Sequence, residues 1–242
     1  MFRVFALAVL ALLAPLEGGG VMFAAKNIYL GRCAKPSTPT AKSYVQDGLI
    51  AMWDGIENAG WGVHDAAATT WKNLISNNDL GPTQGMWSDD GLICTGGMIL
   101  LVRIEDSVST LEIVCSTSRV NTAQLVFNAR RNPSGNFDAG FSFRGNNTVN
   151  FYDGGPCFLA SNPTGINSYA YVWTGSVLYE NGAVKTSLGS GATFRTSYNG
   201  ISTRSEYPYH GKICRIGCYS RALTAEEIAA NYAIDKERFN LP

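Results

Sequence analysis

The chain has little charge and no excess of either sign, and these two deficits exclude several classes of protein. Only 16% of its 242 residues are charged, and 19 basic against 19 acidic side chains give a formal net charge of zero. Nucleic-acid binding needs a surplus of Lys and Arg to displace counterions from phosphates, so we expect no nucleic-acid partner. Charged helix-forming residues are scarce while glycine and aromatic residues are plentiful. This composition favours an all-β domain of short strands over a helical bundle.

Histidine is also scarce, and the cysteines are not spaced as metal ligands. The chain has two histidines, no CxxC motif and six cysteines: Cys33, Cys94, Cys115, Cys157, Cys214 and Cys218. A structural zinc site therefore has little to build on, and the spacing is not typical of a disulfide framework. Cys214 and Cys218 lie in one strand-like segment that would separate them by about 13 Å, too far for a mutual bridge. We expect buried free thiols that pack as small apolar side chains.

No apolar run is long enough to span a membrane. The longest, from Val4 to Leu16, has 13 residues, whereas a transmembrane helix needs about 20. A basic residue followed by such a run is typical of a secretory signal peptide, although its cleavage signal is poor. The alternative is that translation starts at Met22. We therefore expect a signal-like segment or extension over 1–25, a linker over 26–43 that is rich in Lys, Pro, Ser and Thr, and a compact domain over 44–242.

Short alternating segments separated by Gly, Asn, Asp and Pro fill the expected domain, as in a β-sandwich or barrel. In LEIVCSTS, Leu111, Ile113 and Cys115 share one face, and AGFSFRG alternates in the same way. The clearest hairpin is YAYVWTGSVLYENGAVKT, because Asn181 and Gly182 accept the positive φ angles of a type I′ turn.

The C-terminus predicts one substantial helix. Thr224 as N-cap and Glu227 three residues later form a capping box, and Leu223 and Ile228 are placed for a hydrophobic staple. Ile228, Tyr232 and Phe239 fall near one helical face. We therefore expect this helix to lie against the sandwich.

Four segments together carry a family resemblance: GLIAMWDG (48–55); TTWKNLISNNDL followed by MWSDDGLICTGG (69–97); VLYENGAV (177–184); and HGKICRIGCYSRALTAEEIAANY (210–232). Their order resembles the laminin G-like, concanavalin A-like domains of bacterial and phage surface proteins, and the closing strand with its appended helix is the most specific part. The resemblance implies a two-sheet antiparallel jelly-roll sandwich with one C-terminal helix packed on it. The sequence departs from the family in having Cys94, Cys214 and Cys218 where larger apolar residues are common.

The residues that glycoside hydrolysis needs are not evident. A retaining glycosidase places two carboxylates about 5 Å apart, but adjacent pairs such as Asp89 and Asp90 point to opposite faces of a strand. Glu226 and Glu227 belong to the helix cap. The chain also has no GxSxG elbow and no P-loop. We therefore expect a protein that is not an enzyme.

Sugar binding uses exposed aromatic faces together with polar groups that recognise hydroxyls. We expect Trp53, Trp71, Trp87 and Trp173 to be structural. Trp61 differs, because flanking glycines and the following His64 and Asp65 indicate a loop. Two further loop regions are candidates. One holds Arg130, Arg131, Asn146, Asn147, Tyr152 and Asp153, which would converge if the intervening strands form a meander, and the other holds Tyr207, Tyr209 and His210.

The predicted function is a non-catalytic, lectin-like surface module whose partner is a glycan or cell-surface polysaccharide. The alternative is a structural or adhesion module of a phage particle or cell surface that binds protein, and a glycoside hydrolase is the weakest hypothesis. We predict no cofactor, with calcium left open because Asp54, Asp65, Asp79, Asp89 and Asp90 could supply oxygens. A signal peptide would place the protein outside the cell or on its surface, and a start at Met22 would suit a virion component.

Overall fold

The computed structural model describes residues 38–81, 85–96, 100–102, 104, 108–119, 122–130, 137–144, 148–152, 158–161, 169–187, 198–201 and 207–242. The chain divides into Met1–Ser37 and a second compact unit, Thr38–Pro242. All that follows concerns the second unit. The short 3-10 helix η1 (Ala41–Ser43), which precedes the expected start near Tyr44, buries Ala41 completely.

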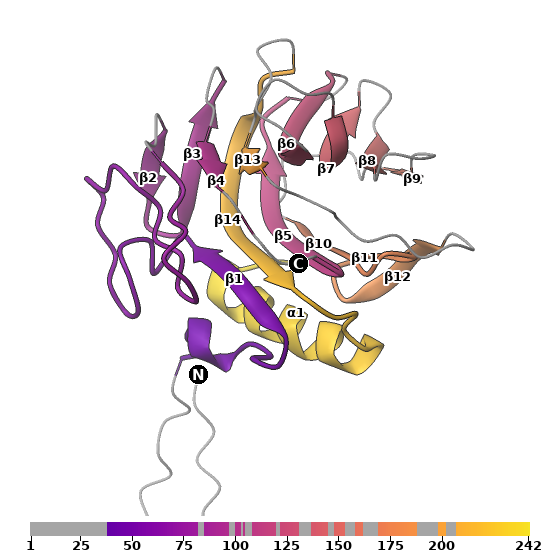
Figure 1. The fold of residues 1–242 in the computed structure, drawn as a ribbon, viewed down its shortest axis with the longest axis horizontal. Coiled ribbons are helices and arrows are strands. Elements are labelled where there is room, and N and C mark those ends of the chain that lie inside the picture. Colours follow the sequence, from indigo (N-terminus) through magenta and orange to yellow (C-terminus); the bar gives the residue numbers. More distant parts are fainter. Residues whose placement is uncertain are drawn as a thin grey trace, which may run out of the picture. The chain divides into compact units, whose positions relative to one another are not determined.

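Within the described residues the strands form two antiparallel sheets (Figure 1). The eight-stranded sheet has the order β12 (Ala183–Ser187), β11 (Val177–Glu180), β10 (Tyr169–Trp173), β5 (Thr110–Thr117), β14 (His210–Tyr219), β3 (Gly91–Thr95) and β2 (Met86–Ser88), and β1 (Leu49–Asp54) also pairs with β14. The six-stranded sheet has the order β4 (Leu100–Val102), β13 (Tyr198–Ile201), β6 (Gln124–Arg130), β7 (Phe137–Arg144), β8 (Thr148–Tyr152) and β9 (Phe158–Ser161).

The main core lies between the sheets. Leu111, Ile113 and Cys115 of β5 pack there together with Phe141 and Val149 of the six-stranded sheet. Alternate positions of a strand point to opposite faces, so the expected shared face of β5 is confirmed. Burial of these apolar side chains is the main favourable contribution to folding.

The opposite face of the eight-stranded sheet is covered by α1 (Ala225–Phe239), which runs across it in Figure 1. Ile228 packs with β1, β10 and β11 side chains, and Phe239 packs with Val114 and Cys214. Strand β5 is buried at every position because both of its faces are covered. The two-sheet antiparallel sandwich with a C-terminal helix is thus confirmed, as is the capping box of Thr224 and Glu227.

The predicted hairpin is also confirmed, and the described cysteines are free and buried as expected. Asn181 and Gly182 join β11 to β12 with φ angles of 51° and 76°. Cys94, Cys115, Cys214 and Cys218 are free and buried, while Cys33 and Cys157 lie outside the described residues. In the described part of the chain there is no helix that is long and apolar enough to cross a membrane.

The structural role expected for the tryptophans is confirmed for three of them. Trp53 and Trp71 are fully buried. Trp87 is half-buried, meets the Trp71 ring edge-on at 5.2 Å between centroids and donates its indole N–H to the Ala68 carbonyl. The side chain of Trp173 lies outside what the structure describes.

A bulge in β14 alters which of its side chains face the helix. The register with β5 shifts between Ile213 and Arg215. Ile213 and Ile216 therefore both face the six-stranded sheet, whereas Cys214 packs on the helix side and Arg215 bonds to α1. A bulge inserts one extra residue and so breaks simple alternation. It is this bulge that directs a guanidinium toward α1.

Candidate functional site

The segment Glu57–Asp65, here called the Trp61 loop, follows β1 and carries three of the residues expected to bind a ligand. Its backbone closes on itself, since Val63 N–H donates to the Gly60 carbonyl at 2.9 Å and Ala59 N–H donates to the Val63 carbonyl at 3.2 Å. Gly60 and Gly62 have φ angles of 133° and 70°, which L side chains rarely adopt. The two glycines therefore serve a tight turn that presents Trp61.

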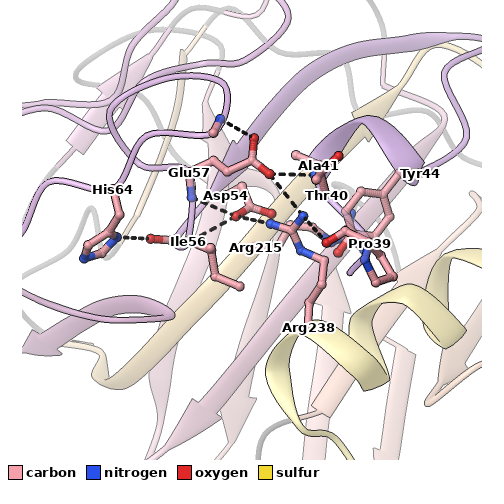
Figure 2. Close-up of polar contacts among 12 residues, drawn as sticks. Pro39, Thr40, Ala41, Tyr44, Asp54, Ile56, Glu57, His64, Arg215 and Arg238 are labelled. Carbon is pink, nitrogen blue, oxygen red and sulfur yellow. Dashed lines mark hydrogen bonds and ion pairs between the residues drawn. The ribbon is translucent and has the colours of Figure 1, made fainter. Parts of the chain in front are cut away.

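The carboxylate of Glu57 fixes this turn from below, as Figure 2 shows. One of its oxygens accepts the Gly62 N–H at 2.8 Å, and the other accepts the Ala41 N–H at 2.7 Å and a guanidinium N–H of Arg238 at 3.1 Å. Burial raises the pKa of Glu57, but the two backbone N–H groups and Arg238 together hold it below its ordinary value. One ionised side chain thus joins the loop to η1 and to α1.

The two ends of the loop are joined by Asn58. Its side-chain amide donates to the Asp65 carbonyl at 2.8 Å, and its side-chain oxygen accepts the Asp65 N–H at 2.7 Å. Asn58 itself is fully buried. The loop is therefore held by buried side chains at its base, which reduces the ordering cost of binding a ligand at its tip.

The outer surface of the loop is aromatic and polar. Trp61 is 37% exposed and Val63 is 51% exposed. The Lys42 ammonium lies 5.1 Å from the centroid of the Trp61 ring, within the range of a cation–π contact. His64 Nδ1 lies 3.1 Å from the Gly55 carbonyl; a carbonyl only accepts, so Nδ1 carries the hydrogen. His64 Nε2 has no partner among the described residues and is free to accept a hydrogen bond.

Beneath the loop, Asp54, Glu57 and Arg238 form what we call the Arg238 junction. One oxygen of Asp54 accepts N–H groups of Ile56, Glu57 and Arg238, at 3.0, 3.1 and 2.8 Å. Its other oxygen is buried without a hydrogen-bond partner in the described structure. Burial raises the pKa of Asp54 to about 6, and the attraction of Arg238 only partly opposes this.

A second buried group, here called the Arg215 cluster, lies between the eight-stranded sheet and α1. Arg215 donates to both oxygens of Asp235 at 2.8 Å and to Glu112 at 2.8 Å, and its guanidinium lies 4.2 Å from the centroid of the Tyr44 ring. Asn231 donates to both oxygens of Glu112. Burial raises the pKa of Glu112, opposed by Arg215. These groups fix α1 on the sheet.

Neither buried charged group was predicted from the sequence. The signal available is that Glu112 and Arg215 each have apolar neighbours within a strand, Glu112 in TLEIVCST and Arg215 in HGKICRIGCY. Asn231 and Asp235 lie one turn apart on α1, in line with buried Ile228 and Phe239, so the helix face that includes them is partly polar.

The candidate region that includes Arg130 and Tyr152 is described only in part. Strands β6, β7 and β8 do form the expected meander, and register pairs Asn128 with Gly140 and Gly140 with Tyr152. Arg130 and Tyr152 are thus backbone positions near the same end of the six-stranded sheet. Their side chains lie outside the described structure, as do Asn147 and Asp153 entirely, so the convergence of this region stays a prediction.

In the candidate region that includes Tyr207 and Tyr209, one tyrosine is exposed and the other is buried. Tyr207 is 42% exposed, but Tyr209 is 0% exposed. The Tyr209 hydroxyl donates to the Ser116 carbonyl at 2.6 Å, and its ring stacks on Phe143 at 6.4 Å. The expectation that Tyr209 contacts a glycan is therefore wrong: its phenol fills the space between the sheets, with a hydrogen bond that satisfies its one polar atom.

Acidic side chains that could hold calcium are largely engaged with basic ones. Asp79 pairs with Lys72 and Asp90 with Lys212, and Asp54 belongs to the Arg238 junction. In the described ranges no group of three or more His, Cys, Asp or Glu side chains is placed to hold a metal ion.

Known proteins share this fold at low sequence identity. No family model matches the chain, and no curated protein matches it. Similar solved structures include Trypanosoma rangeli sialidase, with 16% identity and a TM-score of 0.61 over 83% of this chain. They also include the receptor binding domain of botulinum neurotoxin C/D mosaic serotype, with 11% identity and a TM-score of 0.52 over 78% of this chain. This chain covers 34% of the sialidase and 52% of the toxin domain.

Proposed function

We propose that this domain is a non-catalytic carbohydrate-binding module and that the Trp61 loop is its binding site. The observation that carries the proposal is a large aromatic ring presented to solvent by a rigid, glycine-bounded turn. The apolar face of a pyranose stacks on such a ring, and neighbouring polar groups recognise its hydroxyls. His64 Nε2 and the Asp65 carboxylate supply acceptors on the same loop.

Two of the structurally similar proteins are described with a bound sugar or as receptor binding, which supports this proposal. Trypanosoma rangeli sialidase has been solved in complex with sialic acid, at 17% identity and a TM-score of 0.60, and the toxin domain is described as receptor binding. At such identity the likeness concerns the fold, and no binding residue is transferred from either protein.

The non-catalytic part of the proposal is supported by where four of the described carboxylates lie. Asp54, Glu57, Glu112 and Asp235 cluster below the surface, and each is bonded to an arginine. Most glycosidases use a pair of carboxyl groups that reach the scissile bond, and these four buried, arginine-bound groups are not suited to that role.

The test is a glycan array with the full chain, the Trp61→Ala variant and the Val184→Ala variant. Val184 is 63% exposed on β12, so its variant controls for loss of an exposed apolar side chain elsewhere. Loss of a stacked aromatic costs about 1–1.5 kcal/mol or more, so we expect Trp61→Ala to weaken binding about tenfold. Val184→Ala should bind like the wild type.

The rival function is adhesion to a protein partner. Trp61 and Val63 are exposed on the same loop, and an exposed aromatic anchor also suits a protein interface. A folded chain that binds no glycan on the array would refute the carbohydrate proposal and favour this rival.

A further inference from the structure

The Trp61 loop does not stand alone, because Lys42 of η1 extends over it. Ala41 is fully buried and its N–H is bonded to Glu57, so the backbone that carries Lys42 is fixed relative to the loop. Figure 2 shows η1 and Glu57 meeting at this point. Lys42 is exposed, and its ammonium lies 5.1 Å from the Trp61 ring centroid. The Lys42 cation thus lies over the Trp61 ring.

The charge of Lys42 is not neutralised by any carboxylate in the described part of the chain. By contrast, Lys72, Lys185 and Lys212 each contact a carboxylate oxygen at 2.5 to 2.6 Å. The loop's own Glu57 is already bonded to Arg238 and to two backbone N–H groups. One oxygen of Asp65 accepts the Ala67 N–H. A cation without a carboxylate partner therefore lies over the ring proposed to bind sugar.

We propose that the sugar bound by the Trp61 loop carries a carboxylate and that Lys42 binds this group. The inference rests on the carbohydrate-binding function proposed above and narrows its ligand to acidic sugars. The sugar ring stacks on Trp61, and its carboxylate forms a charge-assisted hydrogen bond with the Lys42 ammonium. His64 Nε2 and the second oxygen of Asp65 accept hydrogen bonds from hydroxyls. A neutral sugar would leave the ammonium without a carboxylate partner.

The experiment compares an acidic glycan with its neutral counterpart of the same shape. Calorimetric titration of the full chain uses 3′-sialyllactose and a glucuronate-terminated disaccharide, each as the free acid and as the methyl ester. The proteins are the wild type, Lys42→Gln, Trp61→Ala and, as a matched control, Lys236→Gln. Lys236 is an exposed residue of α1 that has no carboxylate partner among the described residues.

We expect the wild type to prefer at least one free acid over its ester, and the preference to shrink as salt is raised. An exposed ion pair contributes about 0.2–1 kcal/mol, so Lys42→Gln should weaken acid binding about two- to fivefold. Ester binding should not change, and Lys236→Gln should behave as the wild type.

Two results would overturn the inference, and they are distinguishable. If acid and ester bind equally and only Trp61→Ala weakens them, the ligand is a neutral sugar and the carbohydrate function stands. If neither sugar pair nor any array glycan binds a folded chain, the carbohydrate function itself fails.

Discussion

The eight-stranded sheet has two covered faces that differ in chemistry. The face toward the six-stranded sheet is lined by apolar side chains such as Ile113, Ile213 and Phe141. The face toward α1 also holds Glu112, Arg215 and Asp235 in direct contact. Apolar contacts are non-directional, whereas bidentate ion pairs have fixed geometry. The comparison indicates that one face provides most of the hydrophobic stabilisation and the other sets where α1 and the attached loop lie.

The largest expected effect is on the charged face. Arg215→Met removes the partner of Glu112 and Asp235 and leaves two buried carboxylates uncompensated. Breaking a buried ion pair costs about 3–5 kcal/mol, so we expect a loss of that size in the free energy of unfolding, measured by urea denaturation. Lys236→Met on the exposed side of α1 is the control. A loss below about 1 kcal/mol would mean that α1 is held by apolar contacts alone.

Removal of η1 tests the contacts between this helix and the Arg238 junction. A chain starting at Tyr44 lacks the Ala41 N–H that bonds to Glu57 and the Pro39 carbonyl that accepts from Arg238. Loss of hydrogen bonds to charged groups should cost about 2 kcal/mol relative to a chain starting at Thr38. Urea denaturation of the two chains measures the difference. Equal stability would contradict the anchoring role of η1.

The pH dependence of stability tests the Arg238 junction. The folded-state pKa of Asp54, about 6, exceeds its ordinary value of 3.8, so its contribution is present at low pH and lost as pH rises through 6. Linkage gives a loss of about 1.4 kcal/mol between pH 5 and pH 8. In Asp54→Asn this loss should disappear. Thermal or urea unfolding at the two pH values measures it, and an equal slope in both proteins would exclude Asp54 as its source.

The smallest effect is expected on the apolar face. Ile213→Val removes one buried methylene between the sheets and should cost about 1 kcal/mol. The urea titration that is used for Arg215→Met, a helix-facing position two residues away, also measures this cost. A cost as large as that of Arg215→Met would erase the distinction between the two faces.

Local signals predicted much of the fold. Thr224 and Glu227 gave the start of α1, because a capping box acts within one turn of chain. Asn181 and Gly182 gave a hairpin, because the turn itself requires positive φ angles. Both features depend on residues adjacent in the sequence, so no tertiary contact had to be known.

The buried polar features depend on distant residues and were not predicted. Arg215 contacts α1 because a bulge shifts the alternation of β14, and its partner Glu112 comes from a strand far away in the chain. Tyr209 follows a proline and was expected in an exposed loop, yet its hydroxyl donates to the Ser116 carbonyl of the neighbouring strand β5. Exposure of Trp61 was predicted, because its flanking glycines are a local signal. The Glu57 anchor beneath it was not.

The most direct test of the account is to observe the indole N–H resonances of the tryptophans by NMR during titration with a bound glycan. Trp61→Phe assigns one resonance to Trp61. We predict that this resonance shifts and saturates with the glycan, while those of buried Trp53 and Trp71 stay unchanged. If other resonances shift and saturate with the glycan while the Trp61 resonance stays in place, the proposal that this loop is the binding site is contradicted.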